Sequence, residues 1–236
     1  MNSDIHVLLL PGLLNDVRLW QYQISALSEV AHATVADLTA ADSIPALASA
    51  ALTQAPAERF VLAGLSMGGY VALEIMRQAP ERVVGLALLD TSARPDSPEA
   101  TENRKKLIQL ADRDFPAVLD TLLPKLVHPS HLTDTSIVTT IRAMAESVGK
   151  DAFSRQQRAI IGRIDSRPFL PQIKCPTLVL CGREDVITPI EVHQELVTAI
   201  PNSSLTIIEE CGHLSTLDKP RHVAEALKQW LLNVDR

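Results

Sequence analysis

The 236-residue chain is predicted to fold as an α/β protein with a mostly parallel central sheet, flanking helices and an all-helical insertion. Short apolar runs alternate with helical patterns of about a dozen residues in the first and last parts of the chain, as in repeated β-α-β units. The alternation stops after Asp90, and residues 91–168 show helical periodicity alone. Because a crossover between parallel strands needs only about a dozen residues, this block is predicted to form a cap.

The first part of the chain supplies the early strands and their helices. Strands are expected at residues 5–10, 33–36, 60–64 and 83–89, and helices at residues 20–28, 44–54 and 67–79. The run from Ile5 to Leu10 is continuously apolar, which is typical of a strand buried on both faces of a parallel sheet. Ser43 is the expected N-cap of the second helix, with Pro45 in its first turn.

The rest of the chain divides into the helical block and a return of the alternation. Helices are expected at residues 97–111, 115–127, 132–148 and 151–161, with breaks at Pro116, Pro124, Pro129, Gly149 and Gly162. Strands follow at residues 177–181 and 204–208, and helices at residues 189–199 and 221–232. We therefore expect an α/β core of residues 1–92 and 169–236, with a cap of residues 93–168.

Composition limits the classes of function. Hydrophobic residues make up 46% of the chain and charged residues 21%, which is typical of a soluble globular protein. A net charge of −6 argues against a nucleic-acid partner, which requires a concentrated basic face. The basic run from Arg104 to Lys106 is interpreted as a solvated helix face. No apolar stretch approaches the roughly 20 residues of a membrane span, so no membrane partner is expected.

The sequence also favours a cytoplasmic location. Residues 7–14 are apolar like part of a signal peptide, but Asp4 precedes them, and no basic segment or small-residue cleavage site accompanies them. The three cysteines, Cys175, Cys181 and Cys211, lack the spacing of a disulfide framework or a zinc site. They are expected to be free thiols, as is usual in the cytoplasm.

The sequence Gly64-Leu65-Ser66-Met67-Gly68 lies between a predicted strand and a predicted helix. A G-x-S-x-G pattern in this setting is typical of a nucleophile elbow, in which a sharp turn projects the serine hydroxyl above the sheet. Glycine fits so tight a bend because it lacks a Cβ atom. The backbone N–H group of Met67 begins the helix and can stabilise an oxyanion beside the serine.

A serine hydroxyl needs a base that takes its proton, and the base needs a third group that orients it. Asp185 and His213 each lie in a loop after a late predicted strand, which gives the order serine, acid, histidine. Asp90 also ends a strand and remains the alternative acid. The predicted catalytic residues are therefore Ser66, Asp185 and His213.

Further site residues are expected in the loop after the first strand. The backbone N–H of Leu13 is the candidate second donor of an oxyanion hole, alongside that of Met67. Leu14 and Trp20 are candidate substrate contacts. Catalysis by a serine, a histidine and a carboxylate requires neither a metal ion nor an organic cofactor, so neither is expected.

Taken together, these segments resemble the α/β-hydrolase superfamily, and in particular its small bacterial serine hydrolases with a helical cap. The resemblance rests on Leu10 to Leu13, Gly64 to Gly69, Pro176 to Asp185, Gly212 to Ser215 and Asp218 to Pro220. It implies a Ser66 nucleophile, an Asp185 acid and a His213 base between core and cap. The elbow is most similar to those of carboxylesterases, enol-lactone hydrolases and methyl-ester hydrolases. Many members have His-Gly where this chain has Pro11-Gly12, which implies altered loop packing.

The leading hypothesis is a serine hydrolase that cleaves a small carboxylic ester or lactone through an acyl-enzyme on Ser66. One alternative uses the same residues to cleave a carbon–carbon bond in a diketone-like substrate. Arg155 or Arg158 would then hold a carboxylate, although both are more simply helix-surface charges. Another alternative is a ligand-binding protein on a hydrolase fold. The expected partner is a small molecule, whose identity depends on cap side chains, and the sequence predicts no oligomeric state.

Overall fold

The computed structural model describes residues 5–234, and at its centre lies a six-stranded sheet in which every neighbouring pair is parallel. The strands are β1 (His6–Leu10), β2 (His32–Val35), β3 (Phe60–Leu65), β4 (Val83–Leu89), β5 (Thr177–Gly182) and β6 (Ser203–Ile208). Their order across the sheet is β2-β1-β3-β4-β5-β6. The predicted α/β class with a largely parallel sheet is confirmed.

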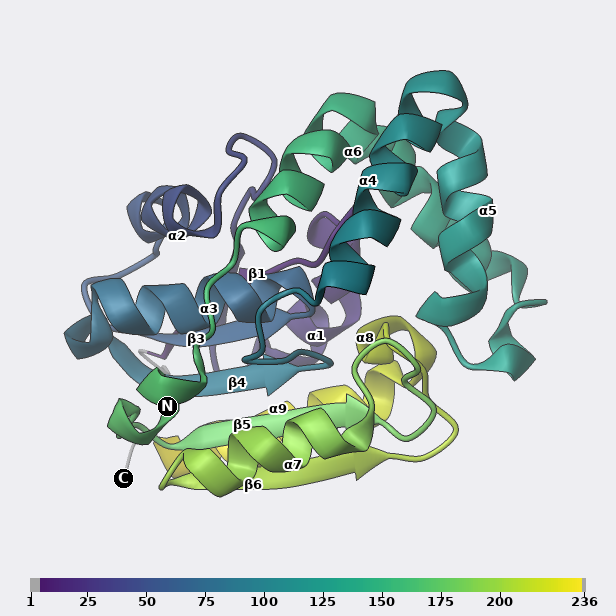
Figure 1. Ribbon diagram of the computed structural model, residues 1–236. Helices are drawn as coiled ribbons and strands as arrows, with labels where there is room; N and C mark the ends of the chain where they lie inside the picture. The colour runs from purple at the N-terminus through teal and green to yellow at the C-terminus, as the bar shows by residue number, and fades with distance from the viewer. Residues whose placement is uncertain (1–4, 235–236) are drawn as a thin grey trace.

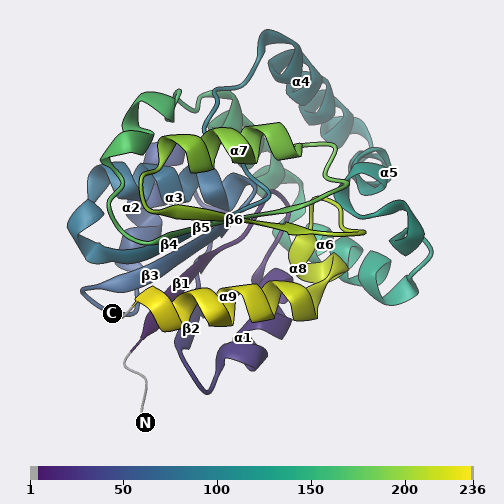
Figure 2. The same cartoon turned by 90° about the horizontal axis from the view of Figure 1, so that it is seen from below.

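Helices cover both faces of the sheet (Figure 2). One face carries α1 (Gln21–Leu27) and α9 (Pro220–Val234), and the other carries α2 (Ile44–Thr53), α3 (Met67–Gln78) and α7 (Ile190–Ala199). Successive strand side chains point to opposite faces, so Leu9 packs in one core cluster with Leu27 of α1. Leu8 packs in a second cluster with Leu47 of α2. Burial on both faces explains why the inner strands β1, β3 and β4 are nearly continuous apolar runs.

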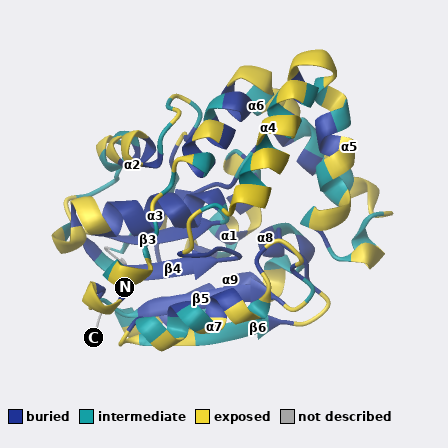
Figure 3. Cartoon of the chain, viewed as in Figure 1, coloured by how far each residue is buried: buried dark blue, intermediate teal, exposed yellow. Residues whose placement is uncertain are grey.

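Between β4 and β5 the chain forms α4 (Pro98–Arg113), α5 (Phe115–Leu126) and α6 (Thr135–Ile161), which we call the helical layer. The three helices pack against one another in a group that stands apart from those flanking the sheet (Figure 1). Their outward faces are exposed, whereas the sheet is largely buried (Figure 3). The short elements are η1 (Val17–Trp20), η2 (Pro80–Arg82), η3 (Pro129–His131), η4 (Arg167–Gln172) and α8 (Ser215–Asp218).

Of the predicted breaks in the helical layer, the one at Pro124 differs from the structure and the one at Gly149 agrees with it. Pro124 lies inside α5 near its end, where the missing N–H removes a single hydrogen bond of the last turn. The helices predicted at residues 132–148 and 151–161 are separated by a kink at Gly149 within the run labelled α6. Gly149 has φ 77° and ψ 168°, a backbone conformation that is essentially restricted to glycine. The break predicted at Gly149 is therefore confirmed, as a kink between two helical segments.

Replacing Gly149 with alanine is expected to destabilise the fold through the backbone alone. A Cβ atom at this position would meet no atom within 4 Å, so collision with neighbours plays no part. The strained φ should lower the free energy of unfolding by about 1–3 kcal/mol, measured by urea denaturation. Gly162→Ala is the matched control, because Gly162 follows the same helix with φ −84°. Equal stability of the two variants would contradict a role for the left-handed conformation.

Candidate active site

Ser66 lies at the turn between β3 and α3. Its φ of 55° and ψ of −116° are unusual for a residue with a side chain, and its N–H donates a 3.0 Å hydrogen bond to the carbonyl oxygen of Leu89. A Cβ atom on Gly68 would lie 2.2 Å from the carbonyl oxygen of Leu10. One on Gly64 would lie 2.3 Å from the carbonyl oxygen of Gly68. Helix and strands therefore approach so closely that glycine is required at both positions.

The imidazole of His213 connects Ser66 to Asp185. His213 Nε2 lies 2.8 Å from Ser66 Oγ, and Nδ1 lies 2.8 Å from Asp185 Oδ2. Asp185 comes from the loop after β5 and His213 from the loop after β6. Because the sheet is parallel, these strands end at the same edge as β3. The structure thus brings the three predicted residues together, at distances suited to proton transfer.

The carboxylate of Asp185 is held by its own loop. Oδ1 accepts hydrogen bonds from the backbone N–H groups of Ile187 and Thr188, at 2.8 Å and 2.9 Å. Oδ2 accepts a further bond from Thr188 Oγ1, at 2.6 Å. The side chain is buried, so these donors replace water around the ionised group. They fix the orientation of the oxygen that contacts His213.

Asp185 and His213 each stabilise the charged form of the other. Burial raises the pKa of Asp185, but the charge of His213, their hydrogen bond and the donors of Thr188 together hold it below its usual range. Burial likewise disfavours the charged imidazole, yet the charge of Asp185 and the hydrogen bond between them raise the pKa of His213 above its usual value. The site therefore favours an ionised carboxylate beside an imidazole that readily accepts a proton.

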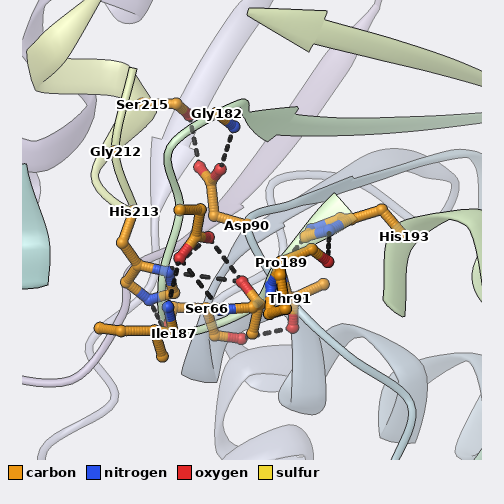
Figure 4. Close-up of polar contacts among 12 residues, drawn as sticks. Ser66, Asp90, Thr91, Gly182, Ile187, Pro189, His193, Gly212, His213 and Ser215 are labelled. Carbon is orange, nitrogen blue, oxygen red and sulfur yellow. Dashed lines mark hydrogen bonds and ion pairs between the residues drawn. The ribbon is translucent and has the colours of Figure 1, made fainter. Parts of the chain in front are cut away.

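Asp90, the alternative acid, is bonded elsewhere (Figure 4). Its Oδ1 accepts a 3.0 Å hydrogen bond from the N–H of Gly182, and its Oδ2 accepts a 2.5 Å bond from the hydroxyl of Ser215. Within residues 5–234 no hydrogen bond joins it to His213. Burial and the charge of Asp185 raise the pKa of Asp90 to about 8, which disfavours the ionised form of this carboxyl group.

His193 also contributes to the site, although no sequence pattern predicted this. It is fully buried on α7, where Nε2 accepts a 3.0 Å hydrogen bond from the N–H of Thr91 and Nδ1 donates to the carbonyl oxygen of Pro189 at 3.2 Å (Figure 4). Burial lowers the pKa of His193 to about 4, which keeps the ring neutral. Thr91 Oγ1 in turn donates to the carbonyl oxygen of Ser66 at 2.8 Å. Through Thr91, His193 thus supports the backbone turn at Ser66.

The backbone N–H groups of Leu13 and Met67 make no hydrogen bond within the described part of the chain. Met67 is the first residue of α3, and the first N–H groups of a helix have no partner inside it. Leu13 follows Gly12, where a Cβ atom would lie 3.3 Å from Cβ of Ser66. The loop after β1 therefore runs close beside the serine, with both N–H groups available to an acceptor.

A cavity of about 230 Å³ is lined by Ser66 and His213. Apolar side chains from the helical layer also line it, among them Leu107 of α4 and Leu119 of α5. Leu14, a predicted substrate contact, lines the cavity. Its φ is 59°, and its N–H donates a 3.0 Å hydrogen bond to Oε1 of Gln156 on α6.

Trp20, the other predicted substrate contact, does not line this cavity. Its side chain is fully buried in the core cluster that contains Leu19 and Leu27. The η1 turn directs it toward the interior beneath α1, so its large apolar surface fills the core. The prediction for Trp20 is therefore corrected, because the tryptophan packs inside the protein and cannot contact a ligand in the cavity.

Arg104 lines the cavity, a position that the sequence reasoning missed. The interpretation of the basic run as a solvated helix face holds for Lys105, whose side chain is 54% exposed, and fails for Arg104, whose side chain is 20% exposed. Ala100 and Leu107 line the same cavity. Their spacing of four and three residues from Arg104 is the helical signal that could have indicated a shared face.

The two arginines considered for carbon–carbon bond cleavage lie outside the cavity. Arg155 Nε donates a 2.8 Å hydrogen bond to the carbonyl oxygen of Thr39. Arg158 is exposed on α6. These positions agree with the interpretation of both arginines as ordinary charged residues of the helix.

Other structural findings concern the whole described chain. The three cysteines are free thiols, as predicted. Over residues 5–234, no helix combines the length and the apolar character that crossing a membrane requires. The same residues contain no group of three or more histidine, cysteine, aspartate or glutamate side chains arranged to hold a metal ion.

A family model described as the α/β hydrolase fold matches residues 5–220. The match covers all six strands of the sheet, together with Ser66, Asp185 and His213. The chain belongs to the α/β-hydrolase family. The resemblance inferred from the separate motifs is therefore confirmed for the protein as a whole.

Relatives of this α/β-hydrolase extend over most of its length. The putative carbamate hydrolase RutD of Pseudomonas savastanoi pv. phaseolicola is 28% identical, over 98% of this chain and 95% of that protein. The pimeloyl-acyl-carrier-protein methyl ester esterase of Nitrosomonas europaea is 28% identical, over 69% of this chain and 67% of that protein. A malate-bound thermophilic esterase from Thermogutta terrifontis has a TM-score of 0.90 at 31% identity, covering 98% of this chain and 91% of that one.

His213 of this α/β-hydrolase is expected to titrate above the usual histidine pKa of about 6.5. Asp185→Asn removes a charge and a charged hydrogen bond, so burial should then bring the pKa of His213 below its usual value. Asp90→Asn breaks no hydrogen bond to the ring and should lower the pKa less. NMR titration of the labelled imidazole nitrogens measures all three proteins. A His213 pKa that Asp185→Asn leaves unchanged would contradict the pairing.

Proposed function

We propose that this α/β-hydrolase is a serine hydrolase that cleaves a small carboxylic ester or lactone through an acyl-enzyme on Ser66. The observation that carries the proposal is the hydrogen-bond path from Asp185 through His213 to Ser66, with 2.8 Å at each ring nitrogen. Two relatives support the reaction class, since one is named a methyl ester esterase and the other an esterase. The path leads directly to a cavity in which a substrate carbonyl can meet the serine.

In the proposed first half-reaction, Ser66 Oγ attacks the carbonyl carbon while His213 Nε2 takes the hydroxyl proton. Asp185 stabilises the imidazolium that forms. The N–H groups of Leu13 and Met67 donate to the oxyanion, and each such donor typically contributes about 2.7–4 kcal/mol in the transition state. The imidazolium then protonates the leaving alcohol oxygen, the carbon–oxygen bond breaks and the acyl-enzyme remains.

In the second half-reaction, His213 takes a proton from a water molecule, which attacks the acyl-enzyme carbonyl. The tetrahedral intermediate collapses, the proton returns to Ser66 Oγ and the carboxylic acid leaves. With a lactone, the alcohol formed in the first half-reaction stays attached to the acyl chain, so a single hydroxy acid is released. All proton transfers use the same imidazole nitrogen.

We propose further that residues 93–168 act as a cap on a core of residues 1–92 and 169–236. Leu107, Leu119 and Ile141 bring apolar surface from three different helices of the layer to the cavity. A volume of about 230 Å³ lies below the roughly 300–1,000 Å³ typical of sites for drug-sized ligands. The cap therefore favours a compact, largely aliphatic substrate.

Hydrolysis of p-nitrophenyl esters from acetate to decanoate tests the proposed function. The native protein is expected to prefer short acyl chains because the cavity is small, and Ser66→Ala should reduce kcat roughly 10³-fold or more. Ser154→Ala is a control, because Ser154 is a buried serine that does not line the cavity. Native turnover no faster than that of Ser66→Ala would contradict ester hydrolysis. Carbon–carbon cleavage or ligand binding without turnover would then become the leading hypothesis.

The value of kcat/KM is expected to rise with pH through the pKa of His213, because only the neutral imidazole can accept the Ser66 proton. Asp185 raises that pKa, so the midpoint should lie above about 6.5. Asp185→Asn should lower kcat roughly 10³-fold to 10⁴-fold, whereas Asp90→Asn should have a far smaller effect. Steady-state rates over a pH series measure both. Equal losses in the two variants would contradict the choice of Asp185 as the acid.

A further inference from the structure

The ionisable side chains that line the active-site cavity carry an unbalanced positive charge. Arg104 of α4 and Lys125 of α5 line it, and no aspartate or glutamate among residues 5–234 does. The chain as a whole has a net charge of −6, so the cavity differs in sign from the rest of the protein. A cleft lined by one sign of charge concentrates ligands of the opposite sign.

The carboxylate nearest to Arg104 does not cancel this charge, because two arginines share it. Arg104 Nε lies 3.2 Å from both carboxylate oxygens of Asp96, and Arg163 Nη1 lies 2.7 Å from Asp96 Oδ1. Within the described chain neither arginine has another carboxylate within 4.0 Å. The Arg163 guanidinium also lies over the ring of Tyr70, 4.5 Å from its centroid. One positive charge therefore remains, and Arg104 brings it to the cavity.

Gln157 of α6 orients the Arg104 guanidinium and adds a second donor. Arg104 Nη1 donates a 2.9 Å hydrogen bond to Gln157 Oε1, while Arg104 Nη2 has no hydrogen-bond partner within residues 5–234. Gln157 is fully buried and lines the cavity, and its Nε2 is buried without a partner. Burying an amide donor without an acceptor costs free energy, and a ligand that supplies an acceptor would remove this cost.

We propose that the substrate carries a carboxylate in addition to the scissile ester or lactone, and that Arg104 and Gln157 bind it. This inference rests on the proposed function and narrows its substrate class. The carboxylate accepts hydrogen bonds from Arg104 Nη2 and Gln157 Nε2, which provide one charged and one neutral donor. It takes no part in bond breaking, which stays at the carbonyl beside Ser66. Lys125 attracts the same anion from an exposed position on the lining.

The shape of the cavity limits the proposed substrate further. Ser66 and His213 belong to the sheet side, and Arg104 and Gln157 belong to the helical layer, with apolar residues such as Leu107 completing the lining. A substrate that reaches both groups needs a short apolar spacer between its two polar ends. Monoesters of short dicarboxylic acids and lactones with a short carboxyl-bearing side chain have this form.

Matched ester pairs test the inference. The monomethyl esters of succinic, glutaric and adipic acids differ from the corresponding methyl ester amides only in a carboxylate that an uncharged carboxamide replaces. For the best chain length, the native enzyme should show a kcat/KM for the acid about tenfold to a hundredfold above that for its amide, measured by pH-stat titration. An acid-to-amide ratio near one at all three lengths would overturn the proposal.

Arg104→Gln is the decisive variant, because it removes the charge and keeps a polar side chain. Asp96 retains Arg163 as an ion-pair partner, so the variant leaves no buried carboxylate unpaired. The acid-to-amide ratio of kcat/KM should fall by about tenfold or more. Lys105→Gln is the matched control, since it removes one charge from the same helix at a residue that pairs with Glu102 outside the cavity. A ratio that Arg104→Gln leaves at the native value would overturn the proposal.

Gln157→Glu provides an independent check with almost no change in side-chain size. The new carboxylate would neutralise the guanidinium of Arg104 and repel a substrate carboxylate at short range. The acid-to-amide ratio should therefore fall here as well, mainly through a higher KM for the acid. A ratio equal to or above the native value would contradict the proposed role of Gln157.

Binding to Ser66→Ala separates failure of this inference from failure of the proposed function. Calorimetry should show that monomethyl glutarate binds more tightly than the corresponding methyl ester amide, and that adding Arg104→Gln abolishes the difference. If no ester is hydrolysed but this difference appears, the proposed hydrolysis fails and the carboxylate site stands. If esters are hydrolysed without any preference for the acid in rate or binding, hydrolysis stands and the carboxylate site is overturned.

Discussion

The backbone contact between the start of α3 and the end of β1 is the constraint on which the rest of the site depends. No side chain fits between Gly68 and the carbonyl oxygen of Leu10, so helix and strand meet through main-chain atoms alone. This contact leaves Ser66 at a turn with positive φ. The same turn places the N–H of Met67 at the positive end of the helix. The other groups of the site are arranged around this fixed point by the ends of β4, β5 and β6.

Burial also decides which groups near Ser66 carry charge. Burial raises the pKa of Asp90 to about 8 and lowers the pKa of His193 to about 4, so it disfavours the charged form of both side chains. Asp185 keeps its charge because His213 and the donors of its own loop stabilise the ionised carboxylate. The two carboxyl groups close to this imidazole thus differ in pKa, which is raised for Asp90 and lowered for Asp185. Hydrogen bonding to His213, and not proximity alone, distinguishes Asp185 from Asp90.

The sequence predicted the sheet, the elbow and the meeting of Ser66, Asp185 and His213 because these follow from simple rules. Apolar runs identify buried parallel strands, and residues just after such strands meet at one edge whatever the packing details. Arg104 and Trp20 depend instead on how one helical segment packs against another. A solvated helix face and a cavity-lining helix face show the same sequence periodicity. The basic composition of residues 104–106 therefore led to the wrong prediction that Arg104 faces solvent. The break predicted at Gly149, in contrast, is present, because glycine alone readily adopts the backbone angles found there.

Gln156 of α6 limits which helical segments of related proteins could replace α4–α6 in this protein. Its Oε1 accepts from the N–H of Leu14 at 3.0 Å, and its Nε2 donates to the carbonyl oxygen of Leu38 at 3.1 Å. One amide therefore joins a helix to the loops after β1 and β2, and the first of these loops runs beside Ser66. A chimaera that grafts the α4–α6 segment of a relative onto this sheet preserves that loop only if the donor helix carries an equivalent amide. The helical layer is thus not an interchangeable module, because part of the support of the loop beside Ser66 lies within it.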